Sequence, residues 1–421
     1  MTKTIRMKIK HLLLPSILLL LLLTSCQYEE IVPPGHFSST QDTLVLSSTK
    51  VRGNGIFMIG AGSFSFRDTT DEVIQEWLDY PIQYPDGVDS LKVGFSLITF
   101  SPFRYRGEAV DTFSGYNKDK SNTIVAMSGK LAGEEIYVFD QNNNQDLRDD
   151  SIRTLNELQW KPTENIIHCE YIVEKDGEER IDTSWFHIGK LRGTPWSYTS
   201  QHMVSNLVID DYAYQLGVVD DNSSSFDFVR PQVAIFAEGE VNRDTLLLRD
   251  YISKDEYLKL GEFYYKFEDF YNGDGTIVLV RDPDFDKKVG VQIDALAPDF
   301  EFVSLGLDTF SNNDFDKDFL LICNFSGCTR RSYDVFENLV AADINNLSIV
   351  GLESGLSVDL GGVTLDVEDP FNEDMYKKYR NWYSSYDSYL IDKEGRIVDK
   401  FSIFDWEDHL KDFIDPALFK N

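Results

Sequence analysis

The side chains best spaced to bind a ligand lie in an Asn- and Asp-rich stretch between residues 140 and 150. Oxygen-bearing side chains recur there at alternate positions and then continue as a carboxylate pair: Asp140, Asn142, Asn144, Asp146, Asp149 and Asp150. Alternate residues of a tight loop can point to one centre, and Ca²⁺ takes six to eight hard oxygen ligands. The spacing therefore predicts a structural calcium site. The alternative is a hairpin turn without a metal, because Asn and Asp favour turns on their own.

This stretch resembles an EF-hand-type calcium loop, with two departures. Gln145 stands where that loop has glycine, and Ser151 stands where it has a bidentate glutamate. The resemblance implies that Asp149 or Asp150 would supply the missing carboxylate. The stretch also follows a strand-like run, residues 136–139, rather than a helix.

The thiols of the chain are few and isolated: Cys26, Cys169, Cys323 and Cys328. Four are too few for a disulfide-stapled scaffold of this length. Cys169 and Cys323 lie within strand-like runs, which predicts that they are buried small hydrophobic residues. Cys328 is followed by Arg330 and Arg331, and nearby cations favour the thiolate, which is the reactive form of cysteine. Cys328 is therefore the candidate catalytic nucleophile.

The first 25 residues have the features of an export signal. Four basic residues within the first ten positions precede an apolar run from Leu12 to Leu23. That run is shorter than the roughly 20 residues needed to span a bilayer. It ends in Leu23-Thr24-Ser25-Cys26, which resembles the lipobox of bacterial lipoproteins. The resemblance implies removal of the signal peptide, residues 1–25, and attachment of fatty acyl chains such as palmitate at Cys26. The alternative is an ordinary secretory signal with an incidental cysteine.

A lipid anchor would place the protein in the bacterial cell envelope, either on the periplasmic face or on the cell surface of the outer membrane. Residues 26–41, which include two prolines and two serines, are expected to be a tether. The membrane is thus one predicted partner and another envelope protein a second. The net charge of −31 argues against nucleic acid, because binding a phosphate backbone requires a basic surface.

The 421 residues leave room for several domains beyond the tether. Short β-branched and aromatic runs between polar turns predict a β-rich region of one or two antiparallel sandwich-like domains, residues 42–157 and 158–290. From residue 291 to 421 strands alternate with helices, which predicts an α/β domain. There Phe371, Met375 and Tyr379 recur at helical spacing and predict one buried helical face.

Three strings in this last part resemble TlpA/redoxin-type thioredoxin-like domains. Ala297-Pro298-Asp299-Phe300 is similar to the entry strand of that group, and residues 319–328 are similar to the strand and loop that lead to its nucleophilic cysteine. Residues 390–398 are similar to its C-terminal hairpin. The resemblance implies a thioredoxin-like fold over residues 291–421, with Cys328 at the N-terminus of a helix.

The redox motif of this group is degenerate here. Its second cysteine is replaced by Arg331, its buried acid by Ile322 and its cis-proline by Tyr386. Exchange of disulfides needs a second thiol to resolve the mixed intermediate. The sequence therefore predicts an envelope lipoprotein of the redoxin family whose thiol chemistry rests on a single cysteine, and leaves enzymatic activity open. The alternative is a non-catalytic binding or scaffold lipoprotein.

Overall fold

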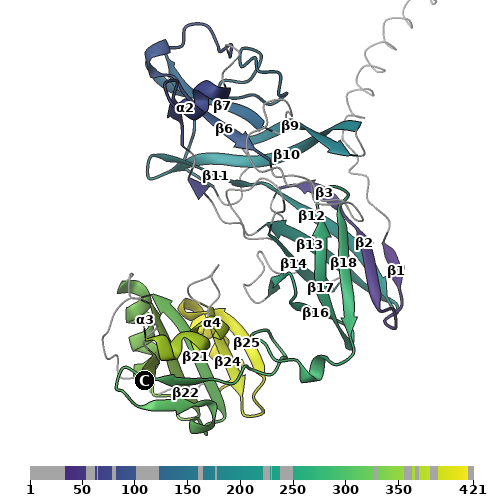
Figure 1. Ribbon diagram of the computed structural model, residues 1–421, viewed down its shortest axis with the longest axis vertical. Coiled ribbons are helices and arrows are strands. Elements are labelled where there is room, and N and C mark those ends of the chain that lie inside the picture. Colours follow the sequence, from purple (N-terminus) through teal and green to yellow (C-terminus); the bar gives the residue numbers. More distant parts are fainter. Residues whose placement is uncertain are drawn as a thin grey trace, which may run out of the picture.

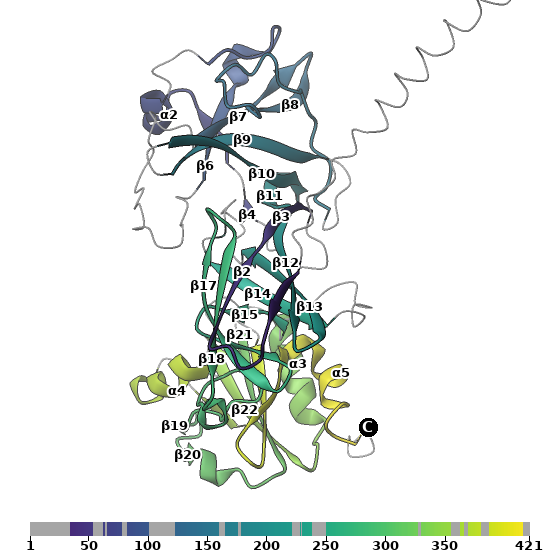
Figure 2. The ribbon, with the colours of Figure 1, turned by 90° about the vertical axis from the view of Figure 1, so that its right-hand side faces the viewer.

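The computed structural model describes residues 34–53, 62–63, 65–77, 82–100, 123–159, 165–175, 178–220, 228, 230–237, 250–326, 330–354, 363–365, 369–379 and 387–415. These residues form two β-rich bodies and one α/β body, which follow one another along the long axis of the molecule (Figure 1). The perpendicular view gives the same order, with the α/β body at one end (Figure 2). Within the described part of the chain, no helix is long and apolar enough to cross a bilayer.

The β-rich body at the far end from the α/β body consists of two four-stranded sheets. The first sheet has the order β5-β6-β7-β8 and the second the order β4-β11-β10-β9. Their bounds are β4 (Gly62–Ser63), β5 (Arg67–Asp68), α2 (Glu72–Trp77), η1 (Ser90–Lys92), β6 (Gly94–Thr99), β7 (Thr123–Leu131), β8 (Glu134–Phe139), β9 (Ile166–Lys175), β10 (Glu178–Leu191) and β11 (Thr194–Thr199). Alternate residues of β7 are buried on opposite faces of its sheet, because Ile124 packs toward the other sheet and Val125 toward α2.

Two hairpins of this body turn within two residues. Ala132-Gly133 joins β7 to β8 with φ of 52° and 91°, and Arg192-Gly193 joins β10 to β11 with φ of 53° and 81°. Positive φ at both central residues is typical of the tight hairpin turn whose twist matches that of the strands. Glycine at the second position carries no side chain that would oppose this conformation.

The middle body is a sandwich built from two separate parts of the chain. Its strands are β1 (Gly35–Phe37), β2 (Thr43–Ser47), β3 (Thr49–Arg52), β12 (Gln201–Ile209), β13 (Tyr212–Asp220), β14 (Pro231–Ala237), β15 (Ile252–Ser253), β16 (Tyr257–Leu260), β17 (Phe263–Tyr271) and β18 (Thr276–Asp282). Strand β2 completes the sheet of β16, β17 and β18, and β1 and β3 both pair with β12. The first body is thus inserted between β3 and β12 of this sandwich.

The predicted boundary between residues 157 and 158 does not match these bodies. Tyr137 and Phe139, which precede it, share one buried core with Ile167 and Phe186, which follow it. The predicted start at residue 42 likewise assigns β2 to the wrong body, because β2 pairs with β18. A pattern of strands along the chain does not reveal which strands pair across a long insertion.

The α/β body has a five-stranded sheet of order β23-β22-β21-β24-β25. Its elements are η3 (Phe285–Lys287), β19 (Glu301–Val303), β20 (Thr309–Ser311), η4 (Asn312–Asp314), β21 (Phe319–Ser326), α3 (Arg330–Ala341), β22 (Leu347–Ser354), β23 (Val363–Leu365), η5 (Pro370–Asn372), α4 (Glu373–Tyr379), β24 (Asp387–Asp392), β25 (Ile397–Ser402), η6 (Ile403–Asp405) and α5 (Trp406–Leu410). Strands β21, β22 and β23 are parallel, and β24 and β25 complete the sheet in antiparallel pairs.

Helices cover both faces of this sheet. Phe336 of α3 and Trp406 of α5 are buried in a core on one face, and Met375 of α4 is buried on the other. This mixed sheet between helices is the α/β architecture expected for residues 291–421. It places the end of β21 and the beginning of α3 next to each other, which is where the sequence predicted thiol chemistry.

Candidate functional site

The predicted thiol site lies at the carboxyl end of β21. Cys328 itself is outside the described residues, as are Cys26 and Tyr386. The described neighbours of Cys328 are the end of β21 at Ser326 and the first turn of α3. These neighbours decide what chemistry the site could still support.

Arg331, in the position of a second redox cysteine, is engaged with an aromatic ring. Its guanidinium carbon lies 4.9 Å from the centroid of the Phe404 ring, and the two are within range of a cation–π interaction. The side chain of Arg330 is 92% exposed, with its Nε 3.7 Å from Asp334 Oδ1. The first turn of α3 therefore carries two cations and no thiol.

Ile322 occupies the place of the buried acid and is itself completely buried. It belongs to the core between the sheet and α4, where it packs with Val350, Tyr379 and Tyr389. An apolar side chain cannot move a proton to or from a thiol, so Ile322 cannot play the role that the resemblance implies at this position.

The two described thiols are inaccessible. Cys169 and Cys323 are both fully buried and free. Burial raises the pKa of the Cys323 thiol to about 12. Burial likewise raises the pKa of the Cys169 thiol well above its usual range. Because the thiolate is the nucleophile, neither residue can attack a disulfide from the folded state.

The Asn- and Asp-rich stretch follows β8 and closes on its own hydrogen bonds. Asp140 is fully buried, and its carboxylate accepts hydrogen bonds from the backbone N–H of Asn144 at 3.0 Å and of Gln145 at 2.9 Å. Gln145 adopts a φ of 64°, the left-handed conformation for which an EF-hand-type loop uses glycine. Asp149 Oδ2 accepts hydrogen bonds from the amide nitrogens of Asn142 and Asn144, at 3.2 and 2.9 Å.

The fit of this stretch to a calcium ion is incomplete. Asp146 pairs with Arg148 and so does not face a common centre. Among the residues that the structure describes, no three His, Cys, Asp or Glu side chains are grouped as a metal would require. One oxygen is not accounted for: Asp150 Oδ2 is buried without a hydrogen-bond partner, although Oδ1 accepts a bond from Gln141 N at 3.1 Å. Burial and the nearby Asp140 and Asp149 raise the pKa of Asp150 to about 6.

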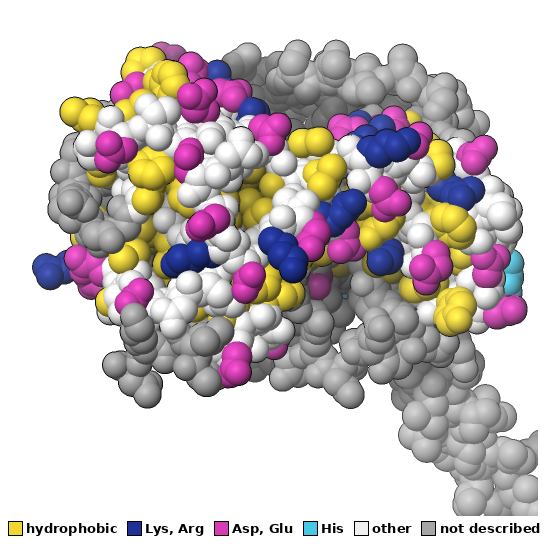
Figure 3. Space-filling view, turned by 90° about the horizontal axis from the view of Figure 1, so that it is seen from below, with side chains coloured by type: hydrophobic (Ala, Val, Ile, Leu, Met, Phe, Trp, Pro, Cys, Tyr) yellow, Lys and Arg dark blue, Asp and Glu magenta, His cyan; other side chains and the backbone are white. Residues whose placement is uncertain are grey.

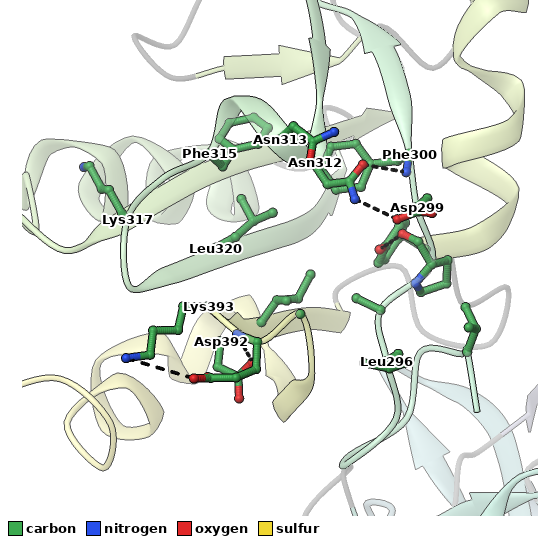
Figure 4. A pocket seen from close by; sticks show the side chains of 17 residues that line it. Leu296, Asp299, Phe300, Asn312, Asn313, Phe315, Lys317, Leu320, Asp392 and Lys393 are labelled. Carbon is green, nitrogen blue, oxygen red and sulfur yellow. Dashed lines mark hydrogen bonds and ion pairs between the residues drawn. The ribbon is translucent and has the colours of Figure 1, made fainter. Parts of the chain in front are cut away.

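A cleft at the opposite end of the α/β sheet was not expected from the sequence. It has a volume of about 420 Å³ and lies between the segment that enters this body, the loop before β21 and the β24–β25 turn (Figure 4). Its lining residues are Val289, Leu296, Ala297, Pro298, Asp299, Phe300, Asn312, Asn313, Phe315, Lys317, Leu320, Tyr379, Ile391, Asp392, Lys393, Glu394 and Gly395. Of this lining only the string Ala297–Phe300 stands out in the sequence, where it indicates the fold rather than a binding site.

Many polar groups of this cleft are already bonded to the protein. Asn312 Nδ2 donates to Asp299 Oδ1 at 2.7 Å, and Lys317 Nζ donates to the carbonyl of Leu347 at 2.8 Å. The view of the molecule from below shows apolar, basic and acidic side chains mixed over this end (Figure 3). The lining combines apolar side chains such as Phe300 and Leu320 with both acidic and basic ones, so the cleft does not select one sign of charge.

No protein-family model matches the chain, and no curated protein matches it significantly. Among solved structures it is similar to the thioredoxin domain of a thiol-disulfide oxidoreductase from Bacteroides vulgatus, with 19% identity and a TM-score of 0.23 over 29% of this chain and 96% of the other. A thiol:disulfide interchange protein from Bacteroides sp. has 17% identity and a TM-score of 0.25 over 31% of this chain and 93% of the other.

The C-terminal domain of a putative thiol-disulfide oxidoreductase from Bacteroides thetaiotaomicron is also similar, with 15% identity and a TM-score of 0.24 over 29% of this chain and 95% of the other. Likenesses at this level decide neither the fold nor the activity. The strand order and the side chains described above must do so.

Proposed function

We propose that this chain is a cell-envelope lipoprotein of the thioredoxin-like, redoxin family, anchored through Cys26, in which two-thiol disulfide exchange is absent. Thiol chemistry is then confined to Cys328. The observation that carries the proposal is the occupation of the second redox position by Arg331, whose guanidinium lies over the Phe404 ring.

The surroundings of the site support this proposal. Cys323, the only other thiol of the α/β body, is buried, so it cannot resolve a mixed disulfide formed at Cys328. The cations of Arg330 and Arg331 at the beginning of a 12-residue helix would still favour a thiolate. A single activated thiol can reduce peroxide, accept a mixed disulfide or be oxidised to a sulfenic acid.

The test is an insulin-reduction assay on protein that begins at residue 27, beside a two-cysteine thioredoxin as the positive control. We expect no turnover above the reductant alone, because the mixed disulfide cannot be resolved within the chain. Cys328→Ser is the matched variant and should behave identically in this assay. Multiple turnovers that disappear in Cys328→Ser would refute the proposal.

The alternative function, a binding or scaffold lipoprotein without catalysis, is favoured by the 420 Å³ cleft. Its volume lies within the range of small-molecule sites, and such sites often form between domains. A fragment screen by ligand-observed NMR would test it, with Leu320→Trp, which fills the floor of the cleft, as the control. Binding that is lost in this variant would favour the alternative, and the absence of any hit would count against it.

We also propose a structural calcium ion at the 140–150 stretch. The support is the buried and unpartnered Asp150 Oδ2, because a carboxylate oxygen without a donor is stabilised by a cation. The ion would be bound by side chains that now bond one another, so Asn142 and Asn144 would have to turn their amide oxygens inward. Its role would be to stabilise the inserted body.

A further inference from the structure

The segment that connects the sandwich to the α/β body is bound along most of its length. It folds back on itself, since Leu296 N donates to the carbonyl of Lys288 at 2.8 Å and Gly290 N to that of Leu296 at 2.9 Å. Its far side adds to the edge of β25, where Ile397 N donates to the carbonyl of Ala295 at 2.9 Å and Asp294 N to that of Ile397 at 2.8 Å. A segment bonded in this way does not act as a flexible linker.

One side chain of the α/β body reaches two points of this segment. Arg396, which follows the turn between β24 and β25, donates from Nη1 to the carbonyl of Asp294 at 2.8 Å and from Nη2 to the carbonyl of Asp286 at 3.0 Å. Asp286 belongs to η3, which begins three residues after β18, the last strand of the sandwich, ends. The planar guanidinium therefore ties the hairpin to both the near and the far end of the connecting segment.

The sandwich holds the same segment from its own side. The ring of Tyr264 on β17 stacks on Phe285, with 3.7 Å between the centroids and 10° between the planes. Tyr264 OH also donates to Asp294 Oδ2 at 2.5 Å. Phe285 and Ala295 are buried together with Tyr257 of β16, whose N–H donates to Gln292 Oε1 at 3.0 Å. The joint between the connecting segment and the sandwich thus has an aromatic core with hydrogen bonds around it.

We infer that Arg396 is a latch that fixes the α/β body rigidly on the sandwich. Relative motion is the usual expectation for two domains joined by a single segment, and here the bonds of Arg396 oppose it together with the backbone bonds and the aromatic core of the segment. Phe319, at the amino end of β21, pairs with Asp392 beside this joint, so the carboxyl end of β21 lies about 23 Å away along an eight-residue strand. The latch would hold the carboxyl end of β21 in one orientation relative to the sandwich. Beside it Ala297 N donates to the carbonyl of Gly395 at 2.7 Å, and both residues line the cleft.

The experiment is hydrogen–deuterium exchange of the full chain in detergent, read at peptides that cover residues 286–297 and 394–399. The unsubstituted protein should protect these amides, and Arg396→Ala should speed their exchange at least tenfold while β21 stays protected. Lys393→Ala is the matched control, because Lys393 lies in the same hairpin with its side chain 68% exposed and should change nothing.

Arg396→Lys keeps the charge but cannot reach both carbonyls, so it should speed exchange in the same peptides to a smaller extent. Arg396→Lys also tests the inference if Arg396→Ala unfolds the α/β body. Rapid exchange of these amides in the unsubstituted protein, or no acceleration in either variant that folds, would overturn the inference.

Discussion

The two predicted sites of this molecule are incomplete in opposite ways. At the end of β21 the resemblance seen in the sequence predicts a redox site, but Arg331 and Ile322 stand at two of its positions. In the 140–150 stretch the oxygen side chains of a calcium loop are present, but they bond one another instead of a common centre. A site thus needs both the residue type and its placement, and either can be missing while the surrounding fold stays intact.

Placing a cysteine at position 331 should have the largest effect, and the effect is on the rate of disulfide reduction. Arg331→Cys creates a second thiol three residues after Cys328, at the beginning of α3. We expect the variant to form an intramolecular disulfide and to reduce insulin at least roughly tenfold faster than the reductant alone, which is the rate expected for the unsubstituted chain. The mass of the alkylated protein after oxidation reports the disulfide. Arg330→Cys is the matched control, and equal activity of the two variants would show that position 331 has no special placement.

The fold around that site should depend on contacts elsewhere in the α/β body. Asp399 is completely buried on β25, and His409 Nδ1 of α5 lies 2.8 Å from its Oδ2 while the His409 ring stacks on Phe401. His409→Ala removes the ring partner of a buried carboxyl group, which should cost about 3 kcal/mol in the free energy of unfolding. Urea unfolding measures this loss. Lys411→Ala, at an exposed position near the same helix, should cost almost nothing.

Supplying the ion to the second site should have a somewhat smaller effect. Calcium at 100 times its dissociation constant should raise the free energy of unfolding of the inserted body by about 2.7 kcal/mol. Thermal unfolding with calcium and with a chelator measures the difference. Asp150→Asn should abolish the shift and Asp274→Asn, in a turn of the sandwich, should preserve it. No shift in the unsubstituted protein would leave the stretch as a hairpin turn.

The smallest expected effect is the change with pH in the free energy of unfolding when no calcium is present. The pKa of Asp150 is raised from 3.8 to about 6, so the folded state binds this proton more tightly than the unfolded state. Its contribution to stability is therefore full below about pH 4 and is lost as the pH rises through 6. The loss should be about 1 kcal/mol after allowance for solvent screening. The difference between the unsubstituted protein and Asp150→Asn across this range isolates it, and parallel curves would contradict the assignment.

Local patterns in the sequence predicted individual helices and strands, but they could not predict which distant strands pair. Met375 and Tyr379 are buried on one face of α4 as their spacing predicted. Phe371, expected on the same face, lies in η5 instead and is half exposed, because the α-helix begins only at Glu373. The pairing of β2 with β18 spans more than 200 residues, and no period along the chain can reveal it.

The candidate sites were predicted by residue type, and their geometry was not. The replacement of the second cysteine by Arg331 was visible in the sequence, whereas its contact with Phe404 depends on how η6 packs beside α3. No pattern in the sequence indicates the Arg396 latch or a binding cleft, because both join residues that are about 100 positions apart.

We propose that Cys328 is the only thiol of the folded domains that reacts with alkylating agents. Alkylation of the protein that begins at residue 27, mapped by mass spectrometry over a range of pH, tests it most directly. We expect modification at Cys328 alone, with a midpoint below the usual thiol pKa of about 8.5. Reaction at Cys169 or Cys323 in the folded state, or an unreactive Cys328, would contradict it.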